Sequence, residues 1–453
     1  MLLTVADAGG DHTTVRDALA AAAPGDRIVV RAGRYVGDLR IDKPVAIIGE
    51  GGRDAVVVKG SVTITSECEL AGLTVAEPTG HGLLVRGTNA APRVTDVRVR
   101  DGAQIGLYVT GGGRGHFERV DIVGSGWSNV EIRDAGSEPT LCHCRVENGK
   151  RGGVYLHSSA RARLHDCDLG GNALANLFIQ SAADPTLVRC RIHDGKEGGM
   201  MSLEGGKGTL EECEVWGNAL SGVELREGAT TTLVRCIVRN GRGNGLFAHS
   251  DGRGELWDCV VFGHGRSGAL IQSGAAPSLV GCVIRDNRDS GVVFERGGGG
   301  TLLDCTIADH SKCGVEVRDD GEPRVERCHV EGAGAAGIEC DEGGAGRFED
   351  CFVARAGAAG VAVGKGARPV LVRTNVEAAL VAVSVARGGT VTVEDCTLRG
   401  RAVAGACVQA GGVASLVRSR VRGGRFGIHF DQPAGGHTVE QCEVAIDNDE
   451  VAA

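Results

Sequence analysis

Leu187-Val188-Arg189-Cys190-Arg191-Ile192 returns 23 residues later as Leu210-Glu211-Glu212-Cys213-Glu214-Val215. Ten cysteines keep this spacing without a break: Cys144, Cys167, Cys190, Cys213, Cys236, Cys259, Cys282, Cys305, Cys328 and Cys351. The series continues through Thr374, Cys396, Ser419 and Cys442, and one-residue slips extend it back through Val120, Val97 and Leu73. An apolar residue stands three places before and two places after each of these 17 positions. A fixed period over so many copies identifies a repeat protein.

A second motif, Gly-apolar-x-apolar, precedes most of these positions by 14 residues, as in Gly222-Val223-Glu224-Leu225 and Gly314-Val315-Glu316-Val317. The alternation predicts a short strand with one buried face. Each repeat then holds two or three strands of three to five residues, which leaves no room for a helix. We therefore predict an all-β fold, a single-stranded right-handed parallel β-helix solenoid of about 17 or more coils of ~23 residues. The cysteine column is expected inside, at a tight bend.

The chain resembles the pectate-lyase-like superfamily of right-handed parallel β-helix proteins. The resemblance rests on Cys-x-Ile or Cys-x-Val bends in place of an Asn-x-Ile ladder, and on the N-terminal stretches 10–19, 28–35 and 43–49. It implies the fold and a substrate cleft along the outside of one sheet, but this fold hosts lyases, hydrolases, esterases, epimerases and binding modules. The Ala/Gly/Val/Arg-rich coils also resemble intracellular actinobacterial β-helix modules that are linked to AAA-type ATPases.

Three segments are predicted along the chain. Residues 1–26 form an N-terminal cap with a short helix over 13–23, residues 27–445 form the β-helix, and residues 446–453 form an acidic C-terminal tail. The helix is expected because threonines precede Val15, Ala18 and Leu19 at helical spacing, and Pro24-Gly25 ends the pattern. Such a helix would cover the open edge of the first coil.

Composition limits the partners. The 49 basic and 58 acidic residues of the 453 give a net charge of −9, which argues against nucleic acid. No apolar stretch is long enough to span a membrane, and the first residues do not resemble a signal peptide. We therefore expect a cytoplasmic protein whose 17 cysteines are reduced. The sequence leaves the oligomeric state open.

Outward positions of the Gly-apolar-x-apolar strands form two columns that we predict to be a ligand-binding strip. The first column contributes Tyr108, Tyr155, Phe178, Glu224 and Phe247, and the second contributes His157, Gln180, Arg226, His249, Gln272, Glu295 and Asp341. Aromatic, amide, His and Arg side chains on a flat face favour binding of a protein or a polysaccharide. The alternative interpretation is stacking that only stabilises the sheet, or a face covered by turns.

One part of this strip has the residue types for acid–base catalysis. Glu316 and Glu339 are expected on neighbouring rungs, with Arg318 beside them as a base or charge stabiliser. Adjacent carboxylates repel, so either one pKa rises or a cation such as Ca²⁺ binds. The alternative is a structural salt-bridge ladder through Glu295, Arg318 and Asp341. We predict no metal site at Cys142-His143-Cys144, because the cysteine column already explains Cys144.

The sequence is consistent with two functions. The short, uniform turns favour a non-catalytic binding or scaffold module that presents the strip to a protein or glycan. The alternative is a carbohydrate-active enzyme, namely a lyase, hydrolase or epimerase on an acidic glycan, or a tailoring enzyme with its site on the same face. The catalytic sets of polygalacturonases and pectin esterases do not transfer to this sequence residue by residue. No cofactor is predicted beyond the candidate Ca²⁺.

Overall fold

The computed structural model describes residues 1–432 and 436–446, and the predicted acidic tail lies outside these residues except for Ile446. The chain divides into two compact units, Met1–Leu220 and Ser221–Ala453, which are described separately. In both units each turn contributes one strand to each of three parallel sheets, A, B and C, and the chain makes about 19 turns in all. Apart from strands, the structure has one short helix, α1 (Val15–Ala21).

The strands of the first unit are short and follow one another in the order A, B, C. Sheet A contains β1 (Leu2–Val5), β2 (Arg27–Val30), β5 (Ala46–Gly49), β8 (Glu69–Ala71), β11 (Arg93–Thr95), β14 (His116–Glu118), β17 (Thr140–Cys142), β20 (Arg163–His165), β23 (Thr186–Val188) and β26 (Thr209–Glu211). Sheet B contains β3 (Gly33–Val36), β6 (Val56–Lys59), β9 (Thr74–Ala76), β12 (Arg98–Arg100), β15 (Asp121–Val123), β18 (Arg145–Glu147), β21 (Asp168–Gly170), β24 (Arg191–His193) and β27 (Glu214–Trp216). Sheet C contains β4 (Leu39–Ile41), β7 (Val62–Ile64), β10 (Leu83–Arg86), β13 (Leu107–Thr110), β16 (Val130–Arg133), β19 (Val154–His157), β22 (Leu177–Ile179) and β25 (Met200–Ser202).

The second unit repeats this arrangement. Its sheet A strands are β29 (Thr232–Val234), β32 (Glu255–Trp257), β35 (Ser278–Val280), β38 (Gly299–Leu303), β41 (Glu322–Glu326), β44 (Arg347–Glu349), β47 (Val370–Val372), β50 (Thr390–Glu394), β53 (Val413–Val417) and β56 (Thr438–Glu440). Its sheet B strands are β30 (Ile237–Arg239), β33 (Val260–Phe262), β36 (Val283–Arg285), β39 (Thr306–Ala308), β42 (His329–Glu331), β45 (Phe352–Ala356), β48 (Asn375–Ala378), β51 (Thr397–Gly400), β54 (Arg420–Gly423) and β57 (Glu443–Ile446). Its sheet C strands are β28 (Val223–Leu225), β31 (Leu246–Ala248), β34 (Ala269–Gln272), β37 (Val292–Glu295), β40 (Val315–Val317), β43 (Ile338–Cys340), β46 (Ala359–Val363), β49 (Val381–Val385), β52 (Ala404–Val408) and β55 (Phe426–Phe430).

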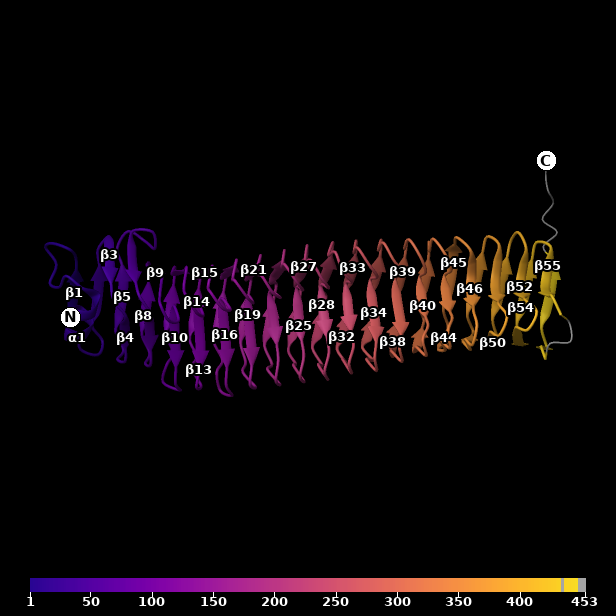
Figure 1. Ribbon diagram of the computed structural model, residues 1–453, viewed down its shortest axis with the longest axis horizontal. Coiled ribbons are helices and arrows are strands. Elements are labelled where there is room, and N and C mark those ends of the chain that lie inside the picture. Colours follow the sequence, from indigo (N-terminus) through magenta and orange to yellow (C-terminus); the bar gives the residue numbers. More distant parts are fainter. Residues whose placement is uncertain (433–435, 447–453) are drawn as a thin grey trace, which may run out of the picture. The chain divides into compact units, whose positions relative to one another are not determined.

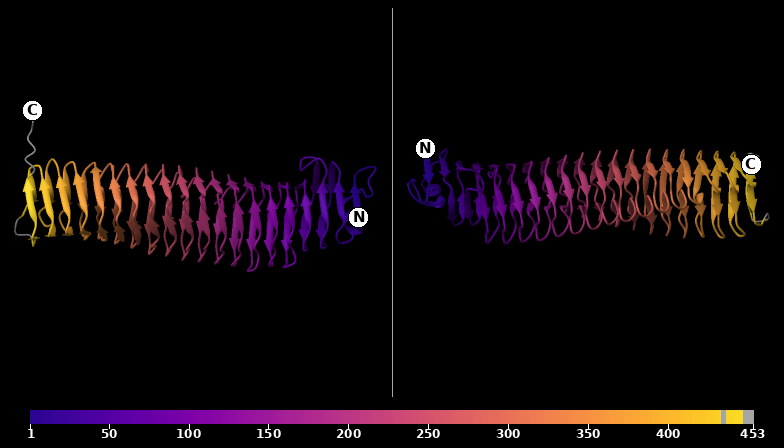
Figure 2. Two further views of the ribbon diagram at one scale, coloured as in Figure 1. Left: turned by 180° about the vertical axis from the view of Figure 1, so that it is seen from behind. Right: turned by 90° about the horizontal axis from the view of Figure 1, so that it is seen from above.

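Within each unit, successive strands of a sheet pair in parallel and in register, as Figure 1 shows. Equivalent residues of neighbouring turns are direct partners, such as Glu131 with Tyr155 and Glu316 with Glu339. Two further views show the same stacking of short strands (Figure 2). Inward residues such as Ile132 and Leu156 are fully buried, while residues between them face outward. The parallel β-helix and its two-residue alternation, predicted from the repeat, are confirmed.

The cysteine column lies at the bend between sheets A and B. The Cys190 backbone N–H donates to Cys213 Sγ at 3.4 Å, and Cys190 Sγ lies 3.5 Å from the carbonyl oxygens of Leu164 and Val188. Thr374 substitutes in this role, because its Oγ1 accepts the Cys351 N–H at 3.3 Å and lies 3.0 Å from the Val372 oxygen. The position therefore needs a small side chain that both donates and accepts, which satisfies backbone groups that the bend would otherwise leave buried and unpaired.

The residue before each of these bend positions has a left-handed backbone, and over much of the chain its side chain alternates between an acidic residue and arginine, with glycine at Gly281. Asp166 has a φ of 54° and Arg189 a φ of 50°. The Arg189 guanidinium donates twice to the Asp166 carboxylate, at 2.9 Å for both contacts. The same paired contact recurs at Arg119–Asp96, Arg327–Asp304, Arg373–Asp350 and Arg418–Asp395. If each turn paired with the turn beyond its observed neighbour, like charges would face each other. The alternating charges therefore favour the observed register.

A second internal ladder lies at the bend between sheets B and C. In the first unit it is built from asparagines, with Asn129 Nδ2 donating to Asn172 Oδ1 at 2.9 Å. In the second unit, His264 N–H donates to Asn287 Oδ1 at 2.9 Å, and Asn287 N–H donates to His310 Nδ1 at 3.3 Å. His310 Nε2 lies 3.1 Å from the Ile284 carbonyl oxygen, so Nε2 carries the proton and the ring is neutral. Burial lowers the pKa of His310 to about 4.

The N-terminal region combines the predicted helix with an additional strand. Helix α1 begins after Thr14, whose side chain accepts the Asp17 N–H, and it buries Val15, Ala18 and Leu19. Strand β1 pairs in parallel with β2, so sheet A already begins inside the segment predicted as a separate cap. No helix in the described residues is long and apolar enough to span a membrane.

The buried thiol ladder predicts low thiol reactivity. Fourteen of the 17 cysteines are buried, while Cys142, Cys407 and Cys442 are partly accessible. Burial raises the pKa of Cys68 to about 12 and the pKa of both Cys351 and Cys396 to about 11. At pH 8, a thiol-disulfide reagent should therefore titrate at most three thiols in the native protein and all 17 in guanidinium. Rapid reaction of many more native thiols would contradict an inward column.

The neutral His310 predicts acid destabilisation of the second unit. The pKa of His310 is lowered from 6.5 to about 4 in the folded chain, so the unfolded chain binds the additional proton between these values. Stability is therefore retained above pH 6.5 and falls toward pH 4, by about 2–3 kcal/mol from this group. His310→Asn replaces the titrating imidazole with an asparagine, the residue type that Asn287 contributes to the same ladder. The urea midpoint of this variant should therefore depend less on pH between pH 7 and 4.5. The exposed His429→Asn serves as the control, and an equal slope in all three proteins would refute the assignment.

Candidate functional site

The predicted binding strip lies on the outward face of sheet C. In the first unit, β16, β19 and β22 place Glu131, Tyr155 and Phe178 on consecutive rungs, because these residues are direct register partners. All three are partly exposed, and their strand neighbours Ile132, Leu156 and Ile179 are fully buried. The outward orientation predicted for these columns is therefore observed. Tyr108 on β13 packs instead against His81, with ring centroids 4.8 Å apart.

Tyr155 begins a chain of hydrogen bonds that crosses three rungs. Its hydroxyl donates to Gln180 Oε1 at 2.8 Å, and Gln180 Nε2 donates to Glu204 Oε2 at 2.6 Å. The Ser181 hydroxyl donates to the same Glu204 oxygen at 2.8 Å. Partial burial, followed by the negative charges of Glu131 and Glu204, raises the pKa of Tyr155. The phenol is therefore held in its protonated form in a fixed orientation on an open sheet face.

His157 lies beside this chain in a second set of contacts. Its ring stacks on Tyr155 with centroids 4.5 Å apart and an angle of 26°. His157 Nε2 lies 3.2 Å from Glu131 Oε1, and Nδ1 lies 2.9 Å from Ser158 Oγ. Only 16% of the His157 side chain and 14% of the Glu131 side chain is exposed. The imidazole is thus fixed on both nitrogens and on one face.

The turns beside these strands add groups that the sequence interpretation missed. Trp127, 50% exposed, lies in the turn before β16, and the Arg151 guanidinium lies 5.7 Å from the centre of its ring. A side chain at Gly152 would approach Phe178 to 3.3 Å, so that ring lies over the glycine backbone. The prediction considered only strand positions, and so it did not include Trp127, Ser158 or Glu204. The sequence signal that could have identified this turn was Trp127, which stands shortly before the strand motif of β16.

The second unit carries a closely similar set on β28 and β31. His249 Nε2 lies 3.1 Å from Glu224 Oε1, and His249 Nδ1 lies 3.0 Å from Ser250 Oγ. Phe247 stacks on His249 with centroids 4.3 Å apart at 26°. The exposed fractions, 16% for His249 and 14% for Glu224, equal those in the first unit. Arg226 lies 3.9 Å from Glu224, and Gln272 on β34 is partly exposed.

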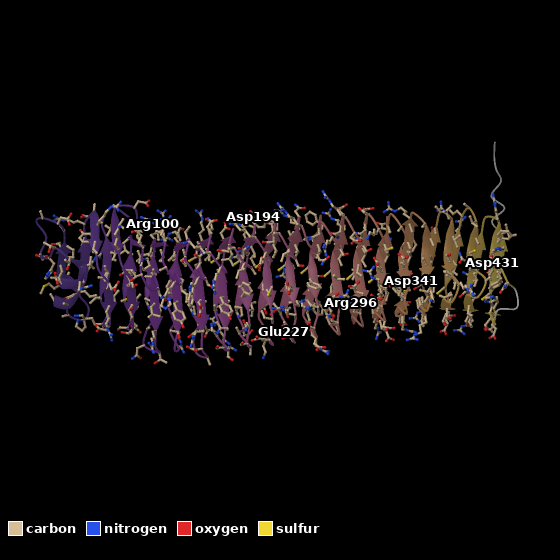
Figure 3. All side chains as sticks on the ribbon, viewed as in Figure 1. Arg100, Asp194, Glu227, Arg296, Asp341 and Asp431 are labelled. Atoms are coloured by element: carbon tan, nitrogen blue, oxygen red, sulfur yellow. The ribbon has the colours of Figure 1, made fainter. Side chains whose placement is uncertain are left out.

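The predicted acid–base group has a different arrangement from the expected ladder. Arg318 contacts Glu295 and Glu316, each at 2.6 Å, rather than bridging Glu295 to Asp341. The Asp341 carboxylate instead accepts the Glu342 backbone N–H at 2.8 Å, because its side chain bends toward its own turn. Glu295 is 7% exposed beneath the guanidinium, which leaves its carboxylate little access to a ligand. Charged side chains such as Arg296 and Asp341 are labelled in Figure 3.

Glu316 and Glu339 are neighbours, as predicted, but each carboxylate already has a partner. Ser290 Oγ donates to Glu316 Oε2 at 2.6 Å, and Cys313 Sγ donates to Glu339 Oε2 at 2.8 Å. Burial, followed by the hydrogen bond to Glu339, raises the pKa of the Cys313 thiol. These residues do not fit a Ca²⁺ site, because Arg318 occupies the space between two of the carboxylates. Among the described residues, no group of three or more His, Cys, Asp or Glu side chains is arranged to hold a metal ion.

A surface cavity of about 630 Å³ lies on sheet A of the second unit, away from the predicted strip. Arg324, Arg347 and Arg368 line it, together with Glu322 and Gly346. Arg324 and Arg347 each bind a glutamate of their own strand at 2.8 Å. The cavity is therefore a basic surface depression in which two of the cations are already paired.

The sequence matches a family model described as a right handed beta helix region over residues 48–179, 81–235, 131–281 and 221–377. No curated protein matches the chain. Solved structures with a similar fold include the A-module of the mannuronan C-5 epimerase AlgE4 from Azotobacter vinelandii, at 16% identity over 76% of this chain and 90% of that chain, with a TM-score of 0.40. The periplasmic alginate epimerase AlgG matches at 11% identity over 62% of this chain and 79% of that chain, with a TM-score of 0.49. Pectate lyase Pel9A matches at 13% identity over 64% and 78%, with a TM-score of 0.35.

The contacts of Arg318 predict that this residue stabilises the second unit. Arg318→Met removes the 2.6 Å partner of both the buried Glu295 and the partly buried Glu316, and leaves Glu295 with the more distant Arg296 at 3.9 Å. Because the guanidinium is itself 41% exposed and solvent screens the pair, we expect a loss of about 1–2 kcal/mol in the free energy of unfolding, measured by urea denaturation. Arg296→Met is the matched control, since Arg296 is 65% exposed and lies 3.9 Å from Glu295. Equal urea midpoints for the two variants would contradict the structural role.

Proposed function

Because this chain belongs to the right handed beta helix region family, whose sheets each turn one face to the outside, we propose that it is a carbohydrate-active protein that binds a glycan on the outward face of sheet C. The family establishes the fold, and the structural likenesses, all with TM-scores below 0.5, do not bear on the activity. The proposal rests on one observation, namely the hydrogen-bonded series Tyr155–Gln180–Glu204 on an open face.

This series has the groups that a sugar chain requires. The ring centroids of Tyr155 and Phe178 lie 6.0 Å apart at an angle of 78°, and this edge-to-face pair gives apolar surface for the C–H groups of a pyranose. Glu204 accepts hydrogen bonds from Gln180 and Ser181, which fix the position of its negative charge. Because Gln180 fixes both neighbours, these polar groups keep their positions before a ligand binds, which reduces the entropic cost of binding.

The edge of the face adds charge and an exposed ring. Trp127 offers a stacking surface, and Arg151 over it supplies a cation that favours an acidic sugar. A flat face without deep enclosure suits an extended polymer better than a small metabolite. A glycan that carries carboxylate groups is therefore the ligand class that these residues support best.

The non-catalytic module that was predicted first from the sequence uses the same face. Both functions need the contacts of Tyr155 and Gln180, and they differ in whether the bound glycan is chemically changed. The partly buried His157–Glu131 pair favours the enzyme, because an imidazole that is held by a carboxylate on one nitrogen and meets a hydroxyl on the other has the arrangement of a general base.

Binding can be tested by removing a single hydroxyl group. Tyr155→Phe removes the hydroxyl that orients Gln180 and should weaken binding of an acidic polysaccharide by about 3–10-fold, as expected for one hydrogen bond. The measurement is affinity electrophoresis or calorimetry over a panel of acidic and neutral polysaccharides. Tyr108→Phe is the matched control, because Tyr108 packs on His81 and lies outside the series. The proposal fails if no polysaccharide binds, or if both variants bind like the parent protein.

A further inference from the structure

We propose that Ser158–His157–Glu131 in the first unit and Ser250–His249–Glu224 in the second are two copies of a nucleophilic serine site that hydrolyses carboxylic esters. Each copy brings together a hydroxyl, an imidazole and a carboxylate by hydrogen bonds of 2.9–3.2 Å. A serine activated by a base that a carboxylate orients is the arrangement required for acyl transfer. This activity goes beyond glycan binding and does not depend on it.

The donor and acceptor roles follow from elementary chemistry. An ionised carboxylate only accepts hydrogen bonds, so His157 Nε2 carries the proton that faces Glu131. His157 Nδ1 is then a lone pair, and the Ser158 hydroxyl donates to it at 2.9 Å. The same reasoning applies to His249, Glu224 and Ser250. Each imidazole is therefore already in the tautomer that accepts a proton from serine.

The local fold exposes the nucleophile and fixes the base. Ser158 has a φ of 55° and Ser250 a φ of 48°, so each serine has a left-handed backbone just after a sheet C strand, Ser158 directly after β19 and Ser250 two residues after the end of β31. Both serines are exposed, whereas each histidine is only 16% exposed. The aromatic ring two residues before each histidine stacks on the imidazole at 26° in both copies. A nucleophile on a sharp turn beside a rigid base is accessible to an acyl group.

An arginine accompanies each copy. Arg133 on β16 is the direct register partner of His157, and Arg226 follows Glu224 at the corresponding place in the second copy. Within the described part of the chain, the buried Arg226 Nε has no hydrogen-bond partner. Each guanidinium contacts the acidic residue that follows it, Arg133 with Asp134 at 3.3 Å and Arg226 with Glu227 at 3.6 Å, and adds positive charge on the rung of the glutamate.

The reaction balances with an ester and water alone. Ser158 Oγ bonds to the carbonyl carbon while its proton passes to His157 Nδ1, and Glu131 stabilises the resulting imidazolium through Nε2–H. The bond from the carbonyl carbon to the alkoxy oxygen then breaks, and that oxygen takes the proton from Nδ1 and leaves as an alcohol. Water next gives a proton to Nδ1 and attacks the acyl-serine, which releases the carboxylic acid and restores the Ser158 hydroxyl. Glu131 acts as a positioning residue throughout.

The chain provides its own matched controls. Ser181 and Ser273 occupy the same turn position on neighbouring rungs, with φ values of 50° and 53°, but each follows a glutamine rather than a histidine. Their side chains therefore lack an adjacent imidazole, and the Ser181 hydroxyl donates to the Glu204 carboxylate instead. Any reagent that reports an activated serine should distinguish Ser158 and Ser250 from this pair.

The test is covalent labelling of the full chain with a fluorophosphonate, followed by peptide mass analysis. We expect labels at Ser158 and Ser250 and none at Ser181 or Ser273. His157→Gln should abolish the label at Ser158 and leave the label at Ser250, while His249→Gln should do the reverse. Ser158→Ala combined with Ser250→Ala should lower kcat/KM for p-nitrophenyl acetate by at least about 100-fold, with Ser159→Ala unchanged.

Several outcomes would overturn the proposal. These are no labelling of the native chain, equal labelling of Ser181 and Ser273, or ester turnover in the double alanine variant equal to that of the parent. The labelling result uses the unaltered protein, so it does not depend on how a variant folds. Because p-nitrophenyl acetate contains no sugar, a failure here leaves glycan binding intact, and a failure of glycan binding leaves this result intact.

Discussion

The fold depends on a tight bend at which backbone groups must find partners inside the turn. A left-handed residue followed by an inward thiol or hydroxyl meets this need, since Cys190 Sγ approaches two carbonyl oxygens and Cys213 Sγ accepts the Cys190 N–H. Because each side chain serves the backbone of the preceding turn, the turns consume nearly the same length of chain. The shorter turn from Thr374 to Cys396 preserves the contact, since the Thr374 N–H donates to Cys396 Sγ at 3.4 Å.

This constraint has a direct consequence for the outward face of sheet C. Residues about 23 positions apart become register partners, and their side chains meet without any local flexibility. Glu131 and His157 are 26 residues apart in sequence, yet their side chains form a fixed hydrogen bond. A polar group placed on such a face is pre-positioned by a backbone that is hydrogen-bonded on both sides, which is the condition for recognition or catalysis at low entropic cost.

The period was sufficient to predict a turn of two or three strands, the inward cysteines and the register partners Glu316 and Glu339. It was insufficient for contacts that depend on rotamers or turns. Arg318 was expected to bridge Glu295 and Asp341, but the flexible guanidinium reaches Glu316 on its own strand instead. Ser158 and Glu204 lie in turns, where two-residue alternation ends and the direction of a side chain no longer follows from position. The Asn and His ladder at the second bend was missed because its residue type changes along the chain, from Asn172 to His264.

The requirements of the fold do not explain why the same Ser–His–Glu arrangement occurs twice. The outward position of sheet C that holds Glu131 and Tyr155 holds Ala362 and Ser384 on later rungs, so the fold does not require Glu or an aromatic residue there. A duplicated block of about four repeats would explain two copies, but it would preserve all three faces equally. The other faces have diverged, since Arg163 and Asp168 of the first copy correspond to Glu255 and Val260 of the second. The carboxylate–imidazole–hydroxyl contacts and the stacked ring keep their geometry in both copies, which is expected if those contacts perform the chemistry.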